Sequence, residues 1–260
     1  MNGWEKKQDP GPAAVIITGA SDGLGAALAR HLACPGRHLA LNGRNPDRLE
    51  MVATFCRQQG ATVDAAICDV TDAGRLAEWL LAVDDRRPTD WLIANAGISA
   101  GTGQAGESAA QVHAIFATNL IGVCNTVLPV LPRLRRRRRG QIGLMASLAS
   151  FHGFPGAPAY CASKAAVRVW GEGLRGELAP EGVGVSVICP GFVRTAMTAV
   201  NRFPMPFLLE PEPAARRIVQ GLAANRARIA FPLPMRLATW ILAALPAAWS
   251  TALTRTTPRK

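Results

Sequence analysis

The 260-residue sequence predicts a single α/β domain, in which a doubly wound parallel sheet of about seven strands carries helices on both faces. Short apolar runs rich in β-branched residues alternate with longer helical patterns from residue 13 to residue 231, and such alternation is typical of a parallel sheet. Hydrophobic residues make up 49% of the chain, which supplies a substantial core and argues against disorder. A glycine-rich turn follows the first strand and gives the predicted sheet a Rossmann-like start.

That turn and its neighbours form the first strand–helix pair. Residues 13–17 predict a buried strand, which leads into Thr18-Gly19-Ala20-Ser21-Asp22-Gly23-Leu24-Gly25 and then into a helix over 26–33. Glycines allow a tight turn and a close approach of the backbone to a pyrophosphate, and a helix N-terminus offers unpaired N–H groups to an anion. The turn is therefore a candidate phosphate site.

The second predicted strand covers residues 38–42 and is followed by Gly43, Arg44 and Asn45. In a dinucleotide-binding sheet the end of this strand meets the adenosine ribose, where an acidic residue accepts hydrogen bonds from the 2′-hydroxyl and repels a 2′-phosphate. This chain has no acidic residue there and offers the Arg44 guanidinium, whose donors match a phosphate. The sequence thus favours NADP over NAD as cofactor.

The remaining elements alternate in the same way. Helices are predicted over 47–59, 72–83, 109–134, 158–178 and 211–224, and strands over 62–67, 91–97 (with a turn), 141–147, 183–189 and 228–231. The helix over 109–134 is expected to bend or break near Pro129 and Pro132, since proline removes a helical hydrogen bond.

The segment around Tyr160, the only tyrosine in the chain, carries the candidate chemistry. Lys164 follows it by four positions, so both side chains lie on one face of the predicted helix. An ammonium group near a phenol favours the phenolate and lowers the tyrosine pKa from about 10, which makes the phenol a usable general acid or base. Ser147 closes the preceding strand and is placed near its carboxyl end.

Six motifs then occur in a recognisable order and spacing. They are Thr18-Gly19-x-x-x-Gly23-Leu24-Gly25, Asn95-Ala96-Gly97, Asn119, Ser147, Tyr160-x-x-x-Lys164 and Pro190-Gly191-x-x-x-Thr195. Together they resemble the short-chain dehydrogenase/reductase family in its single-domain form, over residues 13–231.

The resemblance implies a catalytic set of Asn119, Ser147, Tyr160 and Lys164. Tyr160 would give a proton to a substrate carbonyl or take one from an alcohol, and Ser147 would hydrogen-bond the substrate oxygen. Lys164 would lower the pKa of Tyr160 and bind the nicotinamide ribose, while Asn119 would hold a water that links Lys164 to the solvent. Hydride transfer belongs to the nicotinamide cofactor.

The resemblance also implies which residues bind the nucleotide. They are Gly19, Ser21, Asp22, Gly23, Leu24, Arg44, Asn45, Asp69, Val70, Asn95, Ala96, Gly97, Tyr160, Lys164, Pro190, Val193 and Thr195. The chain departs from the family at Asp22, where many NADP-preferring members have a basic residue, so Arg44 would act with Ser21 and Asn45 alone. A second departure is the alanine in Leu92-Ile93-Ala94-Asn95, where the family often has another asparagine.

These observations lead to an NADP(H)-dependent carbonyl reductase or alcohol dehydrogenase. The segment 192–210, a mobile lid over the substrate in the family, is rich in Phe, Met and Leu and favours an apolar substrate. A 3-oxoacyl-thioester reductase and a reductase of steroid or other lipid carbonyls remain enzyme alternatives. A dinucleotide-binding regulator without turnover is the alternative from another class.

Charge and cysteine usage bear on partners and location. The net charge is +11, and much of it lies in the run from Arg133 to Arg139, which we expect to be a solvated helix end. This run has no interleaved aromatic residues, so a nucleic-acid partner is not expected. The six cysteines form neither a C-x-x-C pair nor a metal-ligand cluster with the four histidines, which predicts reduced thiols, no metal and a cytoplasmic protein.

The two ends of the chain differ from the domain between them. We expect a loose arm over 1–12, the domain over 13–232 and an apolar, basic tail over 233–260. The tail holds Trp240 and Trp249 but is interrupted by Arg236 and Pro246, so it is not expected to span a membrane. Packing on the protein itself is favoured, and peripheral attachment to an anionic membrane is the alternative.

Oligomeric state follows from two helices. The helices over 109–134 and 158–178 are apolar beyond one core-facing stripe, and in the family such helices pair across a two-fold axis, which predicts a homodimer or homotetramer.

Overall fold

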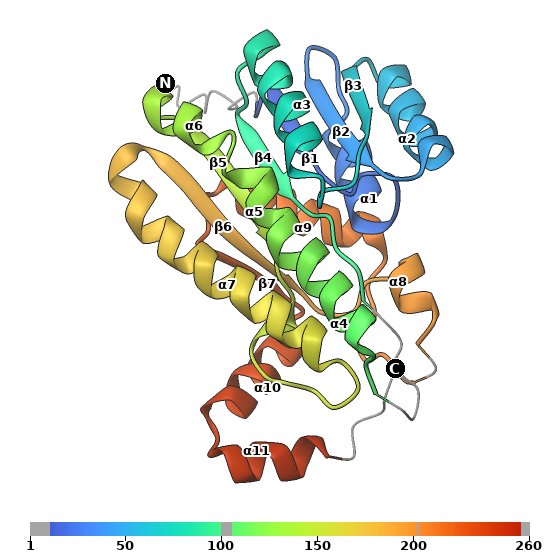
Figure 1. Ribbon diagram of the computed structural model, residues 1–260, viewed down its shortest axis with the longest axis vertical. Helices are drawn as coiled ribbons and strands as arrows, with labels where there is room; N and C mark the ends of the chain where they lie inside the picture. Colours follow the sequence, from blue (N-terminus) through green and yellow to red (C-terminus); the bar gives the residue numbers. More distant parts are fainter. Residues whose placement is uncertain (1–10, 100–105, 202, 256–260) are drawn as a thin grey trace, which may run out of the picture.

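The computed structural model describes residues 11–99, 106–201 and 203–255, and its centre is a seven-stranded parallel sheet (Figure 1). The strand order is β3-β2-β1-β4-β5-β6-β7, and every neighbouring pair is parallel. The strands are β1 (Ala14–Ile17), β2 (His38–Gly43), β3 (Thr62–Ile67), β4 (Trp91–Ala94), β5 (Gly140–Met145), β6 (Val183–Pro190) and β7 (Arg228–Phe231). The predicted doubly wound sheet is confirmed.

Helices cover both faces of this sheet, and each layer has its own apolar core. One face is covered by α1 (Gly23–Leu32), α2 (Pro46–Gln58) and α9 (Pro211–Ala223), which bury Leu28, Leu49 and Ile218. The other is covered by α3 (Ala73–Arg86), α4 (Ala109–Phe116), α5 (Gly122–Val127), α6 (Leu131–Arg137) and α7 (Pro158–Leu178). Successive residues of one strand point to opposite cores, as Leu92 and Ile93 do.

The strand order reverses between β1 and β4, and this reversal positions the site. The chain runs outward from β1 through β2 to β3 and then returns to place β4 on the other side of β1. In doubly wound sheets a ligand-binding crevice opens at the carboxyl ends of the strands where the order reverses. The turns after β1 and β4 therefore lie side by side at the expected ligand site.

The helix predicted over 109–134 is in fact divided. Between α4 and α5 lies η1 (Ala117–Ile121), a π-helical turn, and the chain bends again before α6, where Pro129 and Pro132 had predicted a break. The π turn was not predicted, because its cause is tertiary: the Asn119 side chain hydrogen-bonds the backbone of Ile98, and Gly122 packs against Val70. A Cβ on Gly122 would lie 2.5 Å from Val70 Cγ2.

Residues 109–137 are also long and apolar enough to cross a bilayer by length and composition. However, half of their most apolar window is buried, because α5 packs on α3 and α4 packs on α7. We therefore assign this run to the core of the domain.

The arginine run is only partly a solvated helix end, because Arg136, Arg138 and Arg139 are exposed but most of the run is paired with acidic residues. Arg137 makes two hydrogen bonds of 2.7 and 2.8 Å to Asp84, which Arg133 also contacts, and further pairs join Arg135 to Glu181 and Arg139 to Asp90. Burial alone would raise the pKa of Asp84, but hydrogen bonds from Arg137 and Thr89 hold that pKa at about 2. The run fastens α6 to neighbouring elements.

Two helices follow the last strand and form a hairpin below the carboxyl edge of the sheet (Figure 1). These are α10 (Leu233–Ala244) and α11 (Ala247–Thr254). Met235 packs against the core, and Thr254 lies 3.5 Å from His152, so the hairpin is in contact with the body of the molecule. Residues 1–10 of the predicted arm and 256–260 of the predicted tail lie outside the described residues.

Candidate active site

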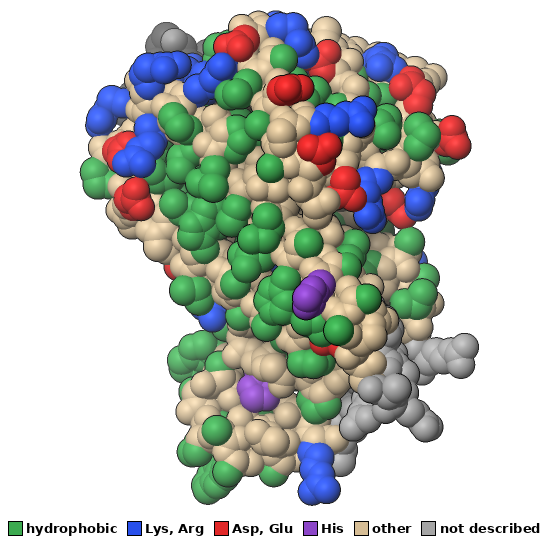
Figure 2. Space-filling view, viewed as in Figure 1, with side chains coloured by type: hydrophobic (Ala, Val, Ile, Leu, Met, Phe, Trp, Pro, Cys, Tyr) green, Lys and Arg blue, Asp and Glu red, His purple; other side chains and the backbone are tan. Residues whose placement is uncertain are grey.

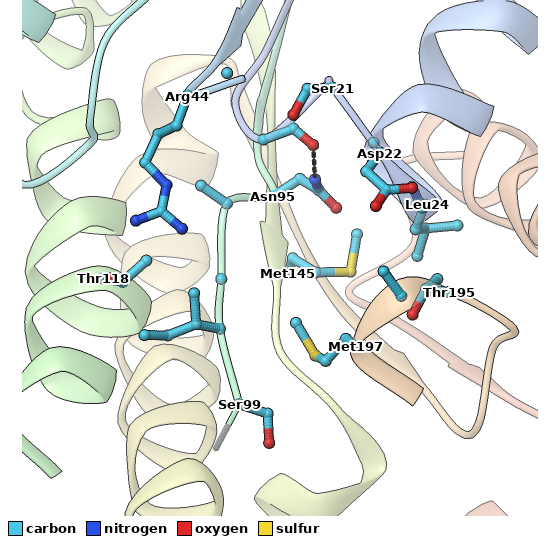
Figure 3. A pocket seen from close by; sticks show the side chains of 18 of the residues that line it. Ser21, Asp22, Leu24, Arg44, Asn95, Ser99, Thr118, Met145, Thr195 and Met197 are labelled. Carbon is cyan, nitrogen blue, oxygen red and sulfur yellow. Dashed lines mark hydrogen bonds between the residues drawn. The ribbon is translucent and has the colours of Figure 1, made fainter. Parts of the chain in front are cut away.

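A cavity of about 800 Å³ opens at the carboxyl edge of the sheet, at the reversal between β1 and β4. Every residue that the sequence predicted to bind the nucleotide lines this cavity. Figure 3 shows Arg44 and Thr118 reaching in from one side and Leu24, Thr195 and Met197 from the other. These predicted residues come from α7 and from the five loops that follow β1, β2, β3, β4 and β6.

The turn after β1 has the geometry of a phosphate cradle. Gly19 and Gly23 have φ of 65° and 53°, in the left-handed region that favours glycine. A Cβ on Gly19 would lie 2.8 Å from Ala96 Cα, so a side chain there would block the approach of the two turns. The Asn95 amide donates to the carbonyls of Thr18 and Gly19 and fixes the same approach.

Helix α1 begins directly at this cradle. It starts at Gly23, earlier than predicted, because Asp22 caps it by accepting a 2.6 Å hydrogen bond from the Gly23 N–H. The glycine cradle, the helix N-terminus and the length of the cavity fit a dinucleotide. The residues present therefore agree with an NAD(P) cofactor.

Two arginines stand at the end of the cavity next to β2. Arg44 pairs with Asp69 at 3.2 Å, and Arg48 pairs with Asp22 at 3.0 Å; both arginines are more than half exposed. Sequence reasoning missed Arg48, although it follows Arg44 by four residues at the start of α2 and could have been placed beside it. Asp22, predicted to weaken a phosphate site, is partly neutralised by this neighbour.

Tyr160 and Lys164 lie in the first turns of α7, as predicted. Lys164 Nζ lies 5.9 Å from the centre of the Tyr160 ring and donates a 2.8 Å hydrogen bond to the carbonyl of Met145, at the end of β5. The lysine side chain is buried, and this burial lowers its pKa to about 8. It is therefore a poorly solvated ammonium whose hydrogen bond goes to a backbone carbonyl.

The pKa of Tyr160 corrects one expectation. The sequence argument predicted that Lys164 would lower it, but burial raises the pKa of Tyr160, and a hydrogen bond with Ser147 only opposes this change. The Lys164 ammonium, which donates to the Met145 carbonyl, does not outweigh this burial. The protein alone thus holds Tyr160 as a phenol, ready to donate a proton.

Ser147 lies partly exposed beside Tyr160 at the margin of the cavity, whereas Asn119 lies buried behind it. Ser147 follows β5 in extended conformation, and its hydroxyl accepts from the Ala149 N–H at 3.1 Å and meets Tyr160. Asn119 is fully buried and donates 3.1 Å to Ser163, whose hydroxyl donates to the Tyr160 carbonyl. Ser163, which the sequence reading missed, thus connects η1 to α7.

Gly97 marks the place where Asn119 and Lys164 converge. A Cβ at Gly97 would lie 3.2 Å from Lys164 Nζ and 3.3 Å from Asn119 Oδ1. Both polar groups therefore lie immediately behind the turn after β4. Because glycine has no side chain, this position of the cavity wall leaves space for Lys164 and Asn119 to converge.

The predicted lid, residues 192–210, is pinned at both ends. Val193 and Leu209 form a short parallel bridge, and the Arg194 N–H donates 2.8 Å to the Leu209 carbonyl. Between them α8 (Ala196–Ala199) brings Met197 to the cavity, while Val200 and Phe207 are exposed. The segment therefore closes one wall of the site with apolar side chains; residue 202 lies outside the described ranges.

Comparison with known proteins agrees with this geometry. A family model for short chain dehydrogenase matches residues 13–204. The chain is 37% identical over 232 residues to an uncharacterized oxidoreductase of Myxococcus xanthus, covering 89% of this chain and 92% of that one. It is 34% identical to the ketoacyl reductase HetN of Nostoc (80% and 74% covered) and 33% identical to a fatty acyl-CoA reductase of Acinetobacter baylyi (89% and 79%).

Solved structures show the same fold with nucleotides bound. A short-chain dehydrogenase of Sphingobium yanoikuyae in complex with NADPH has a TM-score of 0.78 and 26% identity, covering 92% of this chain and 91% of that one. One from Mycobacterium paratuberculosis bound to NAD has a TM-score of 0.74 and 25% identity, covering 84% and 94%. The chain belongs to the short-chain dehydrogenase/reductase family of NAD(P)-dependent oxidoreductases, which act on carbonyl and alcohol groups.

Proposed function

We propose that this protein is an NADP(H)-dependent carbonyl reductase, or in reverse an alcohol dehydrogenase, for an apolar substrate. The observation that carries the proposal is the meeting of Tyr160, Ser147 and Lys164 at one end of a cavity whose other end holds Arg44 and Arg48. One end has proton-transfer groups and the other has phosphate-binding groups.

The chain's own residues would act on the substrate oxygen. The Ser147 hydroxyl donates a hydrogen bond to the carbonyl oxygen and holds it beside Tyr160. The Tyr160 phenol gives its proton to that oxygen as negative charge develops, and it takes the proton back in the oxidative direction. Bound nicotinamide supplies or accepts the hydride.

Lys164 and Asn119 would serve the return of the proton. The buried ammonium of Lys164 lies next to the Tyr160 ring and favours the phenolate left after transfer. Asn119 lies behind Gly97 next to Lys164, where its carbonyl oxygen can orient a water between Lys164 and the solvent. Neither residue needs to touch the substrate for this role.

NADP is favoured over NAD because both arginines next to β2 line the cavity. A 2′-phosphate would replace Asp69 or Asp22 as their partner and gain charge-assisted hydrogen bonds. The neighbouring Asp22 and Asp69 carboxylates oppose this gain, so a moderate preference is proposed. The family includes structures with NADPH and with NAD.

The substrate is proposed to be apolar because Met145 and Met197 line the cavity. A 3-oxoacyl-thioester or another lipid-derived carbonyl is the second candidate, favoured by relatives named ketoacyl reductase and fatty acyl-CoA reductase.

We also propose a homodimer or homotetramer, since Ile121, Leu128 and Val169 are about half exposed on η1, on the C-cap of α5 and on α7. A monomer by light scattering would contradict the assembly.

A turnover screen tests the function directly. Purified protein would be assayed with NADPH and NADH against short and long aldehydes, cyclic and steroid ketones and 3-oxoacyl thioesters, with the matching alcohols in reverse. We expect oxidation of NADPH by apolar carbonyls. Tight nucleotide binding without turnover on any of these classes would instead support the dinucleotide-binding regulator.

A further inference from the structure

The α10–α11 hairpin sorts its side chains in the reverse of the usual way. Its buried positions are Thr239, Ser250 and Thr254, which are 7%, 4% and 3% exposed. Most of its large apolar side chains are exposed instead, and Trp240 and Trp249 are 61% and 66% exposed; Met235, Leu242 and Leu245 are partly buried. A hairpin surrounded by water would be expected to place its apolar side chains inward.

The inward hydroxyls are satisfied within the hairpin itself. Thr239 donates to the carbonyl of Met235 at 3.0 Å, Ser250 to Ala247 at 3.1 Å and Thr254 to Ser250 at 2.9 Å. Such bonds satisfy small polar side chains that face protein, and Thr254 also lies 3.5 Å from His152 of the body. The inner face is therefore complete, and the outer face is the one that lacks cover.

Each helix of the hairpin carries exposed apolar side chains. On α10 the exposed residues Leu233, Leu237, Trp240 and Ile241 recur at intervals of four, three and one, which is the spacing of a single helical stripe. On α11 Trp249 and Leu253 are four apart, and both are more than 60% exposed. Figure 2 shows few charged side chains on this lower part of the molecule, whereas they gather over the sheet layers above.

Charge indicates what covers this face. Glu212 is the last acidic residue of the sequence, and the 48 residues after it contain eight arginine and lysine residues. Arg236 and Arg255 lie in and next to the hairpin and are exposed. A basic, acid-free segment with outward indole rings matches an anionic lipid surface, where tryptophan favours the headgroup level and arginine the phosphates.

A second copy of the chain fits less well. A two-fold contact through this face would bring the same arginines of two hairpins together, with no acidic residue on either hairpin to pair with them. A membrane-spanning arrangement is also excluded by length, since the 12 residues of α10 extend about 18 Å against a hydrocarbon core of about 30 Å.

We propose that the outer face of the α10–α11 hairpin docks this protein on an anionic membrane surface, with Trp240 and Trp249 as anchors. The hairpin would lie in the plane of the interface. Met235 of α10 approaches the turn after β6, where a Cβ on Gly191 would lie 3.0 Å from its Sδ, and α11 contacts the loop between Ser147 and Tyr160 through His152. Docking would therefore turn the catalytic edge toward the bilayer.

The test uses the full-length protein and vesicles of phosphatidylcholine, alone or mixed equally with phosphatidylglycerol. Parent, Trp240→Ala/Trp249→Ala and the matched control Met51→Ala would be sedimented with each vesicle at low and high salt. Met51 is 68% exposed on α2, away from the hairpin. Thermal unfolding and NADPH titration without vesicles would show that each variant is folded.

We expect the parent and Met51→Ala to sediment with the anionic vesicles, less so at high salt, and the double variant to bind about tenfold more weakly. Equal binding of the parent and the double variant would overturn the assignment of this face. Equal binding to vesicles with and without phosphatidylglycerol would overturn the proposal that the membrane surface must be anionic. Absence of vesicle binding, with a smaller assembly for the double variant by light scattering, would show that a second copy covers the face instead.

Discussion

Two regions of this molecule depart from the usual sorting of side chains, and they do so in opposite directions. At the catalytic edge, polar groups are buried: Asn119 and Lys164 are 0% and 3% exposed, and each is held by hydrogen bonds to the chain. In the hairpin, apolar groups are exposed and no described residue covers them. We propose a partner outside the polypeptide for each: cofactor and substrate at the catalytic edge, and a membrane surface at the hairpin.

The comparison also separates two kinds of function. Buried polar groups with fixed partners give the precise geometry that proton transfer needs. Exposed apolar groups need no fixed partner and suit a surface of variable composition. We therefore expect substitutions at the catalytic edge to change chemistry, pH dependence or cofactor choice, and substitutions in the hairpin to change none of these.

The largest effect is expected from Tyr160→Phe. The substitution removes the phenolic proton but keeps the ring, so turnover of carbonyl substrates should fall by roughly 10²–10⁴-fold. NADPH affinity and the unfolding temperature should stay near those of the parent. Steady-state kinetics and calorimetry measure both, and turnover near that of the parent would remove Tyr160 from the proposed mechanism.

The second effect concerns pH and the buried lysine. Burial lowers the pKa of Lys164 from 10.5 to about 8, so between these values the unfolded chain holds a proton that the folded chain lacks. Raising the pH therefore favours the folded parent through this group. Below about pH 8 the lysine is charged in both states, and its contribution stays constant.

Comparing the parent with Lys164→Met isolates this contribution, since the thiols and other titrating groups are common to both. The difference in free energy of unfolding should move in favour of the parent by about 1.4 kcal/mol per pH unit above about pH 8. Denaturant titrations across this window measure it. A difference that stays constant would show that the lysine is not desolvated as the structure indicates.

The third effect concerns the cofactor. Arg44→Ala and Arg48→Ala should each reduce the preference for NADPH over NADH by about tenfold, because each removes charge-assisted hydrogen bonds to a 2′-phosphate. Arg57→Ala is the control, since Arg57 lies on α2 with Arg48 and pairs with Glu50 away from the cavity. Equal affinities for the two nucleotides in the parent would refute the NADP proposal.

The smallest effect is expected in the hairpin. Without membranes, Trp240→Ala should change the free energy of unfolding by less than about 0.5 kcal/mol, since most of the side chain is already in water. Ile93→Ala, at a fully buried position of β4, should cost about 2–5 kcal/mol. A large loss for Trp240→Ala would mean that the indole is covered in the isolated protein, and the contrast between the two regions would disappear.

The sequence was sufficient for the sheet, which follows from local patterns, and the family resemblance identified residues that line the cavity. Strand periodicity predicted six of the seven strands to within two residues, and the fourth, predicted with its turn over 91–97, ends at Ala94. The glycine turn and the segment after β6 both line the one crevice. Parallel strands of a doubly wound sheet leave few ways to arrange these turns. The topology of the sheet thus brings motifs that are far apart in the sequence together in one site.

What the sequence could not supply were effects of distant partners. The arginine run resembled a solvated helix end because its partners Asp84, Asp90 and Glu181 lie more than 40 positions away. The pKa of Tyr160 depends on burial, which spacing alone does not fix. The reversed polarity of the hairpin likewise appears only once the inner and outer faces are known.

The π turn at η1 has a consequence for how this chain tolerates changes in length. An α-helix rotates by about 100° per residue, so the additional residue in a π turn sets α4 and α5 in different rotational phases. Ser108, which caps α4, and Val127 of α5 are thus held in position by a count of residues as well as by their chemistry. Losing one residue between Ala117 and Ile121 would put the two helices back in phase, draw Asn119 away from Ile98 and turn one of the two faces out of the core. An insertion before Ser108 could not correct this, whereas an insertion within the same five residues could. The number of residues in the π turn therefore fixes the rotation of α5 relative to α4.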